Sequence, residues 1–240
     1  MKLIVDIGNT FTKLGVFDNN NNITKLTNLT NNNKQIYEYI SSISIKKAII
    51  ANVGENNSKL SKLLNDLNIP TIIFNSKTPI PIKNLYATPE TLGVDRLAAI
   101  IGAFSLFNNQ NILIIDAGTA LTIDFINKKG EYLGGNISPG MEMRFKALNT
   151  FTNKLPFISK DYTFNFIGTS TKTAIISGVQ QGMINEIEGY INYFHNKYNS
   201  LKIILTGGDS FFFEKNIKNP IFANSELVLI GLNYILQYND

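Results

Sequence analysis

The chain has 240 residues, of which 44% are hydrophobic and 17% charged, and its formal net charge is +4. This composition predicts a globular protein with a sizeable core and excludes a disordered chain. There is no cysteine and one histidine, His195, which excludes disulfides, thiolate metal sites and multi-histidine metal sites.

Neither the charges nor the apolar runs indicate a nucleic-acid or membrane partner. The lysines are scattered, and no basic run carries interleaved aromatic residues, so we expect no nucleic-acid binding. The first residues lead straight into a strand pattern without a targeting segment, and no apolar run is long enough to cross a bilayer. We therefore expect no membrane association and a cytoplasmic protein.

The chain opens with an apolar run that ends in an aspartate, Asp6. Residues 3–5 and 14–17 are apolar and predict two strands on either side of a turn. Gly8 and Asn9 tolerate the tight or left-handed backbone that such a turn needs. This pattern fits an ordinary hairpin, in which Asp6 and Asn9 only shape the turn.

The polar residues of the same turn also suit a bound phosphate. Such a turn directs backbone N–H groups, with the hydroxyls of Thr10 and Thr12, toward one spot. Lys13 adds a point positive charge, and Asp6 could hold a hydrated Mg²⁺. Taken alone, this stretch supports the hairpin and the phosphate site about equally.

Apolar periodicity predicts alternating strands and helices as far as residue 107. The segment 76–92 is irregular and holds three prolines, and a loop this long in a compact domain is often functional. We predict strands over residues 23–29, 47–53 and 71–74, and helices over residues 34–43, 58–68 and 93–107.

The opening pattern returns at residue 112. An apolar strand over 112–115 is followed by Asp116, Gly118 and Thr119 in a turn. The repeat predicts a duplicated α/β protein with halves 1–110 and 111–240, whose Asp-x-Gly turns would face each other across a cleft. We further predict strands over 121–126, 132–137, 202–205 and 221–223, helices over 141–150, 170–198 and 227–237, and an irregular segment over 150–166.

A third motif, Thr206-Gly207-Gly208, follows the strand predicted over 202–205. Adjacent glycines after a strand would let a flat ring or a ribose approach the backbone closely. Each of the three motifs is weak alone. In this order and at this separation, they resemble those of the actin, sugar-kinase and Hsp70-like ATP-binding superfamily.

Within that superfamily the sequence resembles the type III pantothenate kinases over nearly the whole chain. The Gly-x-Asp-Arg block at 93–96 and the Gly-Gly-x-Ile-x-Pro-Gly block at 134–140 carry the most specific part of the resemblance. The matching blocks are residues 6–13, 86–96, 116–122, 134–140, 168–171 and 206–209.

The resemblance implies a fold and a reaction. The fold would be two duplicated RNase H-like (actin-like ATPase) domains, each a mixed sheet flanked by helices, with an interdomain cleft. The reaction would be the ATP-dependent phosphorylation of pantothenate to 4'-phosphopantothenate, the first step of coenzyme A biosynthesis. The family's members require Mg²⁺ and a monovalent cation, K⁺ or NH4⁺, and work as homodimers.

The resemblance also implies an ATP site and two cation ligands. Asp116 matches the family's K⁺ ligand, and Asp6 would hold Mg²⁺ through water. The residues that match the ATP site are Asp6, Ile7, Gly8, Asn9, Thr10, Phe11, Thr12, Lys13 and Thr119.

A substrate site follows from the same resemblance. Asp95 would be the general base for the attacking hydroxyl, and Arg96 could pair with the carboxylate of pantothenate. The residues that match the pantothenate site are Tyr86, Gly93, Val94, Asp95, Arg96 and Thr171.

Each of these residues also has a purely structural interpretation. Asp95 could merely favour a helix N-terminus, worth ~0.3–1 kcal/mol. Arg96 could form a surface ion pair, Tyr86 could pack on the core, Thr171 could cap the long helix, and Asp116 could cap its turn.

Three other functions stay open at this point. A transcriptional accessory factor related to this family would be expected to lose Lys13, Asp95, Arg96 and Asp116, which are all present. A different small-molecule kinase or phosphatase of the superfamily is a second alternative. An RNase H-like nuclease would need clustered carboxylates around two metals, and its chemistry gives the glycine turns no role.

Gly178 and Gly182 lie four residues apart on the predicted long helix, so that another helix could approach closely. That helix could belong to a second subunit or to the same chain.

Overall fold

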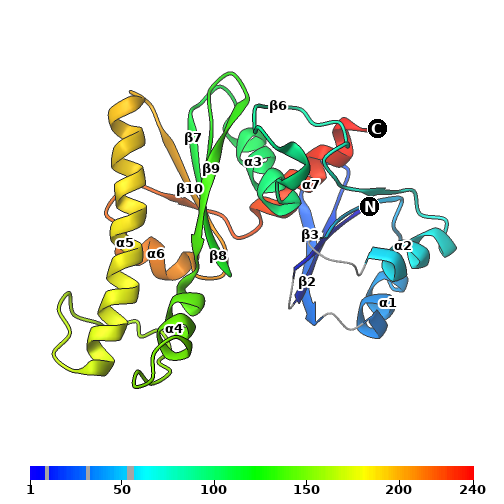
Figure 1. Cartoon of the computed structure of the whole chain (residues 1–240). Helices are drawn as coiled ribbons and strands as arrows, with labels where there is room; N and C mark the ends of the chain where they lie inside the picture. Colours follow the sequence, from blue (N-terminus) through cyan, green and yellow to red (C-terminus); the bar gives the residue numbers. More distant parts are fainter. Residues whose placement is uncertain (9–10, 31–32, 53–56) are drawn as a thin grey trace. The chain divides into compact units, whose positions relative to one another are not determined.

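The computed structural model describes residues 1–8, 11–30, 33–52 and 57–240, which form two compact units. Unit 1 comprises Met1–Leu106 and Glu226–Asp240, and unit 2 comprises Phe107–Ser225. Figure 1 shows the helices and strands of each. The division expected from the sequence, 1–110 and 111–240, assigns the last helix to the second half, whereas here that helix packs in unit 1.

Unit 1 is built on a mixed sheet with the strand order β3-β2-β1-β4-β5. Strand β1 pairs antiparallel with β2 and parallel with β4. The short strand β6 (Lys83–Asn84) lies within the predicted irregular segment. The sheet strands are β1 (Lys2–Ile7), β2 (Phe11–Phe17), β3 (Ile23–Thr30), β4 (Lys47–Asn52) and β5 (Thr71–Ile73).

Helices cover both faces of this sheet, which explains why its central strands are apolar almost throughout. Leu3, Val5 and Ile7 share a buried cluster with residues of α1 and α2. Because successive side chains of a strand point to opposite faces, Ile4 and Asp6 face α3 and α7 instead. The helices of unit 1 are α1 (Asn33–Ser41), α2 (Asn57–Asp66), the 3-10 turn η1 (Pro89–Thr91), α3 (Val94–Leu106) and α7 (Leu227–Tyr238).

Two glycines allow α3 and α7 to cross closely. A Cβ atom on Gly102 would overlap the carbonyl of Leu227, and one on Gly231 would overlap the carbonyl of Ala98. On the sheet side of α7, Leu229 lies against Gly15 of β2. This fit explains why the C-terminal helix joins unit 1, although it closes the chain.

Unit 2 repeats the plan of unit 1. Its strands follow the order β11-β10-β7-β8-β9, and β7 pairs antiparallel with β8 and parallel with β10. Each unit is thus a meander of three strands followed by parallel strands, as the duplication predicted. The strands are β7 (Ile112–Ala117), β8 (Ala120–Ile126), β9 (Glu131–Pro139), β10 (Lys202–Thr206) and β11 (Phe222–Ala223).

The long helix of unit 2 supplies most of the apolar side chains that cover its sheet. Ile187 and Ile191 of this helix are fully buried in one cluster with Leu113 and Ile115 of β7. The helices are α4 (Met141–Thr150), α5 (Thr171–Lys197) and α6 (Ser210–Asn216).

The predicted helices and strands agree with these elements to within a few residues, and 150–166 is irregular as expected. The short elements β6, η1 and α6 had no predicted bounds. Within the described part of the chain, no helix combines the length and apolarity needed to span a membrane.

Candidate active site

The first predicted turn lies at the end of β1. The Gly8 N–H donates to the carbonyl of Phe11 at 3.0 Å, which closes the turn tightly. Asn9 and Thr10 lie outside the described residues. Next to the turn, Ile7 and Thr12 are buried, whereas Phe11 is 55% exposed. Thr12 therefore points into the protein from its strand.

Asp6 and Lys13 are direct partners across β1 and β2. Lys13 Nζ lies 3.1 Å from Oε2 of Glu226, the N-cap residue of α7, and both side chains are mostly buried. The pKa of Asp6 is raised from 3.8 to about 6, because burial and then the nearby Asp95 carboxylate raise it more than Lys13 lowers it. The structure thus brings Asp6, Lys13 and Asp95 together in unit 1.

Asp95 lies in the first turn of α3, where its Oδ1 accepts the Arg96 N–H at 2.8 Å. The helix-terminus role considered from the sequence is therefore present, and it also fixes the direction of the carboxylate. A Cβ atom on Gly93 would lie 2.6 Å from that oxygen, so any side chain there would displace Asp95. Val94 opens the helix between them.

Arg96 and Tyr86 form a second contact beside Asp95. The guanidinium carbon of Arg96 lies 5.8 Å from the centre of the Tyr86 ring, within cation–π range. Arg96 is 8% exposed, so the interpretation as a surface ion pair is wrong. The Tyr86 N–H donates to Asn84 at 3.0 Å, which anchors the loop that carries the ring.

In unit 2, three loops converge around Asp116 at the end of β7. The Gly118 N–H donates to Ala120 and the Gly140 N–H to Thr119, both at 3.1 Å. The Asp209 N–H donates to Ala117 at 2.9 Å. The predicted second and third motifs are therefore directly joined.

Glycine is required where these loops meet. Gly207 has a φ of +93°, and a Cβ atom there would overlap the Asp116 carboxylate and the Ala117 carbonyl. A Cβ atom on Gly140 would overlap the carbonyls of Gly118 and Thr119. Asp116 and Thr119 therefore lie on a turn that is enclosed by close backbone contacts.

Thr171 is the exposed first residue of α5. The N-cap is Ser170, whose Oγ accepts the Thr173 N–H, while Thr173 Oγ1 accepts the Ser170 N–H at 2.9 Å. The capping role considered for Thr171 therefore belongs to Ser170.

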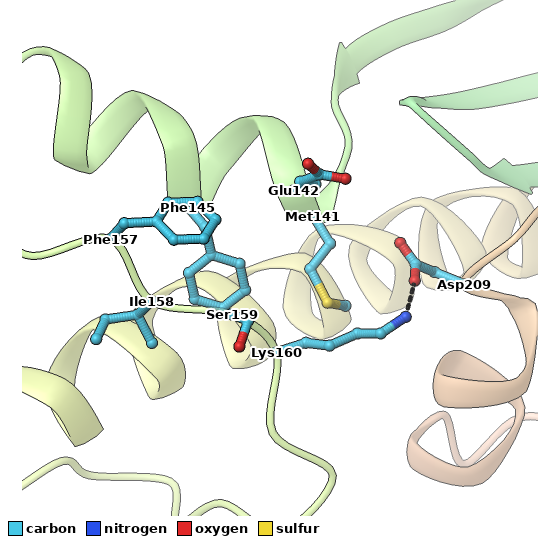
Figure 2. Close-up of a pocket in the computed structure, with 8 residues that line it drawn as sticks. All are labelled: Met141, Glu142, Phe145, Phe157, Ile158, Ser159, Lys160 and Asp209. Carbon is cyan, nitrogen blue, oxygen red and sulfur yellow. Dashed lines mark hydrogen bonds and ion pairs between the residues drawn. The ribbon is translucent and has the colours of Figure 1, made fainter. Parts of the chain in front are cut away.

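A cavity of about 260 Å³ opens in unit 2 beside the third motif (Figure 2). Lys160 reaches across it to Asp209, with Nζ 2.6 Å from Oδ1, and this hydrogen bond raises the pKa of Lys160. Gln180 of α5 holds the adjoining chain through two 2.8 Å hydrogen bonds to the backbone of Asp161. The lining residues are Met141, Glu142, Phe145, Phe157, Ile158, Ser159, Lys160 and Asp209.

The carboxylates fit the two expected cations in different ways. The Asp95 carboxylate adds to the electrostatic cost of ionising Asp6, and a divalent cation bound there together with a phosphate would relieve that cost. Across the described ranges, no three metal-ligating side chains cluster, so Mg²⁺ would depend on water and phosphate for most ligands. Asp116 offers a single carboxylate among backbone groups, which suits a more weakly bound cation.

Sequence reasoning missed the role of Glu226. It directly precedes the helix predicted over 227–237 and belongs to none of the motifs named from the sequence. The ion pair with Lys13 depends on the return of the chain to unit 1, and no local pattern in the sequence reports that return.

Comparison with known proteins identifies a family. Residues 2–193 match the family model described as type III pantothenate kinase. A type III pantothenate kinase from Phocaeicola vulgatus is 45% identical over 240 residues, which cover 100% of this chain and 99% of the relative.

Two solved structures share the fold of this chain. One is described as a Baf family transcriptional activator from Campylobacter jejuni, with a TM-score of 0.67, 23% identity, and coverage of 99% of this chain and 98% of that one. The other is a ROK family glucokinase from Streptomyces griseus, solved with glucose and AMPPNP. Its TM-score is 0.55 at 12% identity, with coverage of 98% of this chain and 99% of that one.

The raised pKa of Asp6 predicts that Asp6→Asn stabilises the protein at neutral and alkaline pH. The folded pKa of about 6 exceeds the unfolded value of 3.8, so ionisation of Asp6 opposes folding as the pH rises through 6. The expected gain in the free energy of unfolding at pH 8 is at most about 3 kcal/mol, and it vanishes below about pH 4. Urea unfolding across this pH range measures it.

Asp66→Asn is the matched control, because Asp66 is an exposed carboxylate at the end of α2. It should leave the pH dependence of unfolding unchanged. Equal stability of wild type and Asp6→Asn at every pH would contradict the electrostatic cost assigned to Asp6.

Proposed function

Because the chain belongs to the type III pantothenate kinase family, it phosphorylates pantothenate with ATP, and we propose that Asp6, Lys13 and Asp95 carry this chemistry. The product is 4'-phosphopantothenate, and the reaction is the first step of coenzyme A biosynthesis. The observation that carries the residue assignment is the gathering of Asp6, Lys13 and Asp95 in unit 1, where Asp95 perturbs the pKa of Asp6.

Asp95 is the general base of the proposed mechanism. It accepts a hydrogen bond from the attacking hydroxyl of pantothenate and takes its proton as the bond to phosphorus forms. Since the transition state of phosphoryl transfer is loose, orienting that hydroxyl in line with the leaving group matters as much as removing its proton. The Arg96 N–H bond to Asp95 Oδ1 leaves the second carboxylate oxygen to do this.

In this proposal, pantothenate contacts the protein through its carboxylate and through the rest of its chain. Arg96 pairs with the carboxylate by two parallel N–H bonds, and its contact with Tyr86 limits the positions that the guanidinium can take. Gly93 and Val94 bring the backbone close to the substrate. Thr171, exposed at the start of α5, adds a hydroxyl contact.

The proposed ATP contacts come from residues of both Asp-x-Gly turns. Lys13 neutralises phosphate charge, and Thr119 donates its hydroxyl from the second turn. The described residues Ile7, Gly8, Phe11 and Thr12, with Asn9 and Thr10 outside the described ranges, complete the first turn.

Two cations support the reaction in this proposal. Asp6 would hold Mg²⁺ through water, and the bound ion would supply positive charge beside the transferring phosphoryl group. Asp116 holds K⁺ or NH4⁺ beside the second turn.

A homodimer is the proposed working form. Among the described residues, a Cβ atom on Gly178 or Gly182 would meet nothing within 4 Å apart from the adjoining parts of α5 itself, and Gly178 is exposed. This face of α5 is thus open to a helix of a second subunit.

A transcriptional accessory role has no observation in its favour. The relative from Campylobacter jejuni is 23% identical, which supports a shared fold and no more.

Asp95→Asn should reduce turnover by about 10²–10³-fold while the affinity for ATP changes little. The asparagine oxygen can still accept the Arg96 N–H, so the start of α3 should keep its structure. Steady-state kinetics with ATP and pantothenate, together with calorimetric ATP binding, measure both effects. Glu90→Gln, an exposed change on the preceding loop, should leave both unchanged. Normal turnover in Asp95→Asn would remove Asp95 as the base.

Activity should be higher in K⁺ or NH4⁺ than in Na⁺ at equal ionic strength, because Asp116 is proposed to select a larger monovalent cation. Asp116→Asn should abolish this difference. Initial rates in chloride salts of the three cations test it. A wild-type enzyme with the same rate in all three salts would rule out the assigned role of Asp116.

Light scattering after size-exclusion chromatography should give the mass of a dimer. Gly182→Leu should shift the measured mass toward that of a monomer. The leucine side chain would occupy the space beside Gly182 that a helix of the second subunit needs. Asn199→Leu, an exposed change beyond α5, serves as control and should stay dimeric. A wild-type monomer at micromolar concentration would argue against the dimer.

A further inference from the structure

The second turn is held from outside by a polar cluster in which only Ser138 belongs to one of the matching sequence blocks. Arg144 of α4 donates from Nε to the Pro139 carbonyl at 2.8 Å and from Nη2 to Ser138 Oγ at 3.2 Å. The same Nη2 lies 2.5 Å from Oε2 of Glu186 on α5, and Ser138 donates to Oε1 of Glu186 at 2.6 Å. We call Ser138, Arg144 and Glu186 the brace.

The brace acts on the corner between β9 and α4. In Figure 1, α4 follows directly after β9, and α4 also contacts β8 and α5. The corner residues Pro139 and Gly140 adjoin the second turn, because Pro139 is the register partner of Ala120 and the Gly140 N–H donates to Thr119. Any movement of this corner therefore moves Thr119.

Most side chains at the end of β9 are exposed to solvent. Gly135, Asn136, Ile137 and Pro139 are exposed, so the position of the strand end relies on polar bonds. Glu186, by contrast, lies on a well-packed helix, since the next residue, Ile187, is completely buried. The brace thus ties an exposed strand end, which is paired with β8, to the long helix α5, whose inner face is buried.

Arginine is specifically suited to this place. Its planar guanidinium reaches three acceptors at once, whereas a lysine ammonium would act as one point charge. The side chains of Arg144 and Glu186 are only 22% and 25% exposed, so solvent screens their attraction incompletely. Lys146 and Glu142 on the same helix also pair, at 3.2 Å, but are 64% and 76% exposed.

We infer that Arg144 and Glu186 are positioning residues for ATP, which hold the Thr119 turn in the geometry that the phosphates require. This inference rests on the proposed contact between Thr119 and ATP. Neither residue touches the substrates, so their loss should act on ATP binding through the turn. The binding of pantothenate, assigned chiefly to unit 1, should be spared.

The test is steady-state kinetics of Arg144→Met, Arg144→Lys and Glu186→Gln. We expect Arg144→Met to raise the KM for ATP about tenfold, the loss of a charge-assisted bond, with the KM for pantothenate changed less than about twofold. Arg144→Lys and Glu186→Gln keep part of the network and should fall between wild type and Arg144→Met. The double variant Arg144→Met/Glu186→Gln should be no worse than Arg144→Met.

Lys146→Met is the matched control, because it breaks an exposed ion pair on the same helix, and it should change neither KM. A merely structural brace would lower the fraction of active enzyme, and so the apparent kcat, without changing the ratio of the two KM values. If Arg144→Met does not fold, the same ratio measured in Arg144→Lys and Glu186→Gln decides. An unchanged KM for ATP in these variants overturns the inference.

Thr119→Val separates this inference from the proposed function. If Thr119→Val raises the KM for ATP and the brace variants do not, the brace alone is refuted. If Thr119→Val leaves the KM for ATP unchanged, the proposed contact between Thr119 and ATP is refuted, and the inference that rests on it is refuted with it.

Discussion

Unit 1 holds a carboxylate, Asp6, at a place where the surrounding protein disfavours its charge. Asp6 ends a buried strand on the face covered by α3 and α7, and Asp95 approaches it from the first turn of α3. Lys13 offsets this repulsion only in part, since it is also paired with Glu226. Carboxylates therefore outnumber the lysine, and the excess negative charge suits a hydrated cation that arrives with ATP. The catalytic role proposed for these residues would explain an arrangement that folding alone would not favour.

Glycines decide how closely the backbone can approach the charged groups. Gly93 leaves room for the Asp95 carboxylate, and Gly207 leaves room for Asp116. Any side chain at either position would displace the acid, so the glycines belong to the site although they carry no chemistry. The same property of glycine, at Gly102 and Gly231, brings α7 into unit 1 and Glu226 next to Lys13. Backbone fit and charge placement are therefore coupled in this protein.

The sequence predicts whatever depends on local pattern. The strands and helices follow apolar runs and periodicity, and the two Asp-x-Gly turns reveal the duplication. Contacts between distant segments leave no such pattern. The pairing of Glu226 with Lys13 and the brace of Arg144 with Glu186 join elements far apart in the chain, so a single sequence cannot report them. Boundaries are also fixed by single bonds: Ser170, and not Thr171, caps α5 because its hydroxyl meets the Thr173 N–H.

Each of the two duplicated units has an aspartate at the same point of its first strand. The two aspartates differ in the residue that each faces on the adjacent strand. The register partner of Asp6 is Lys13 on β2, whereas the register partner of Asp116 is Thr122 on β8. A neighbouring ammonium competes with any directly bound metal, so Asp6 is suited to a cation held through water and shared with phosphate. Asp116 has a neutral strand partner and close backbone groups instead, which are typical surroundings for a monovalent ion. The different cations proposed for Asp6 and Asp116 would then follow from the residue that each faces on the adjacent strand.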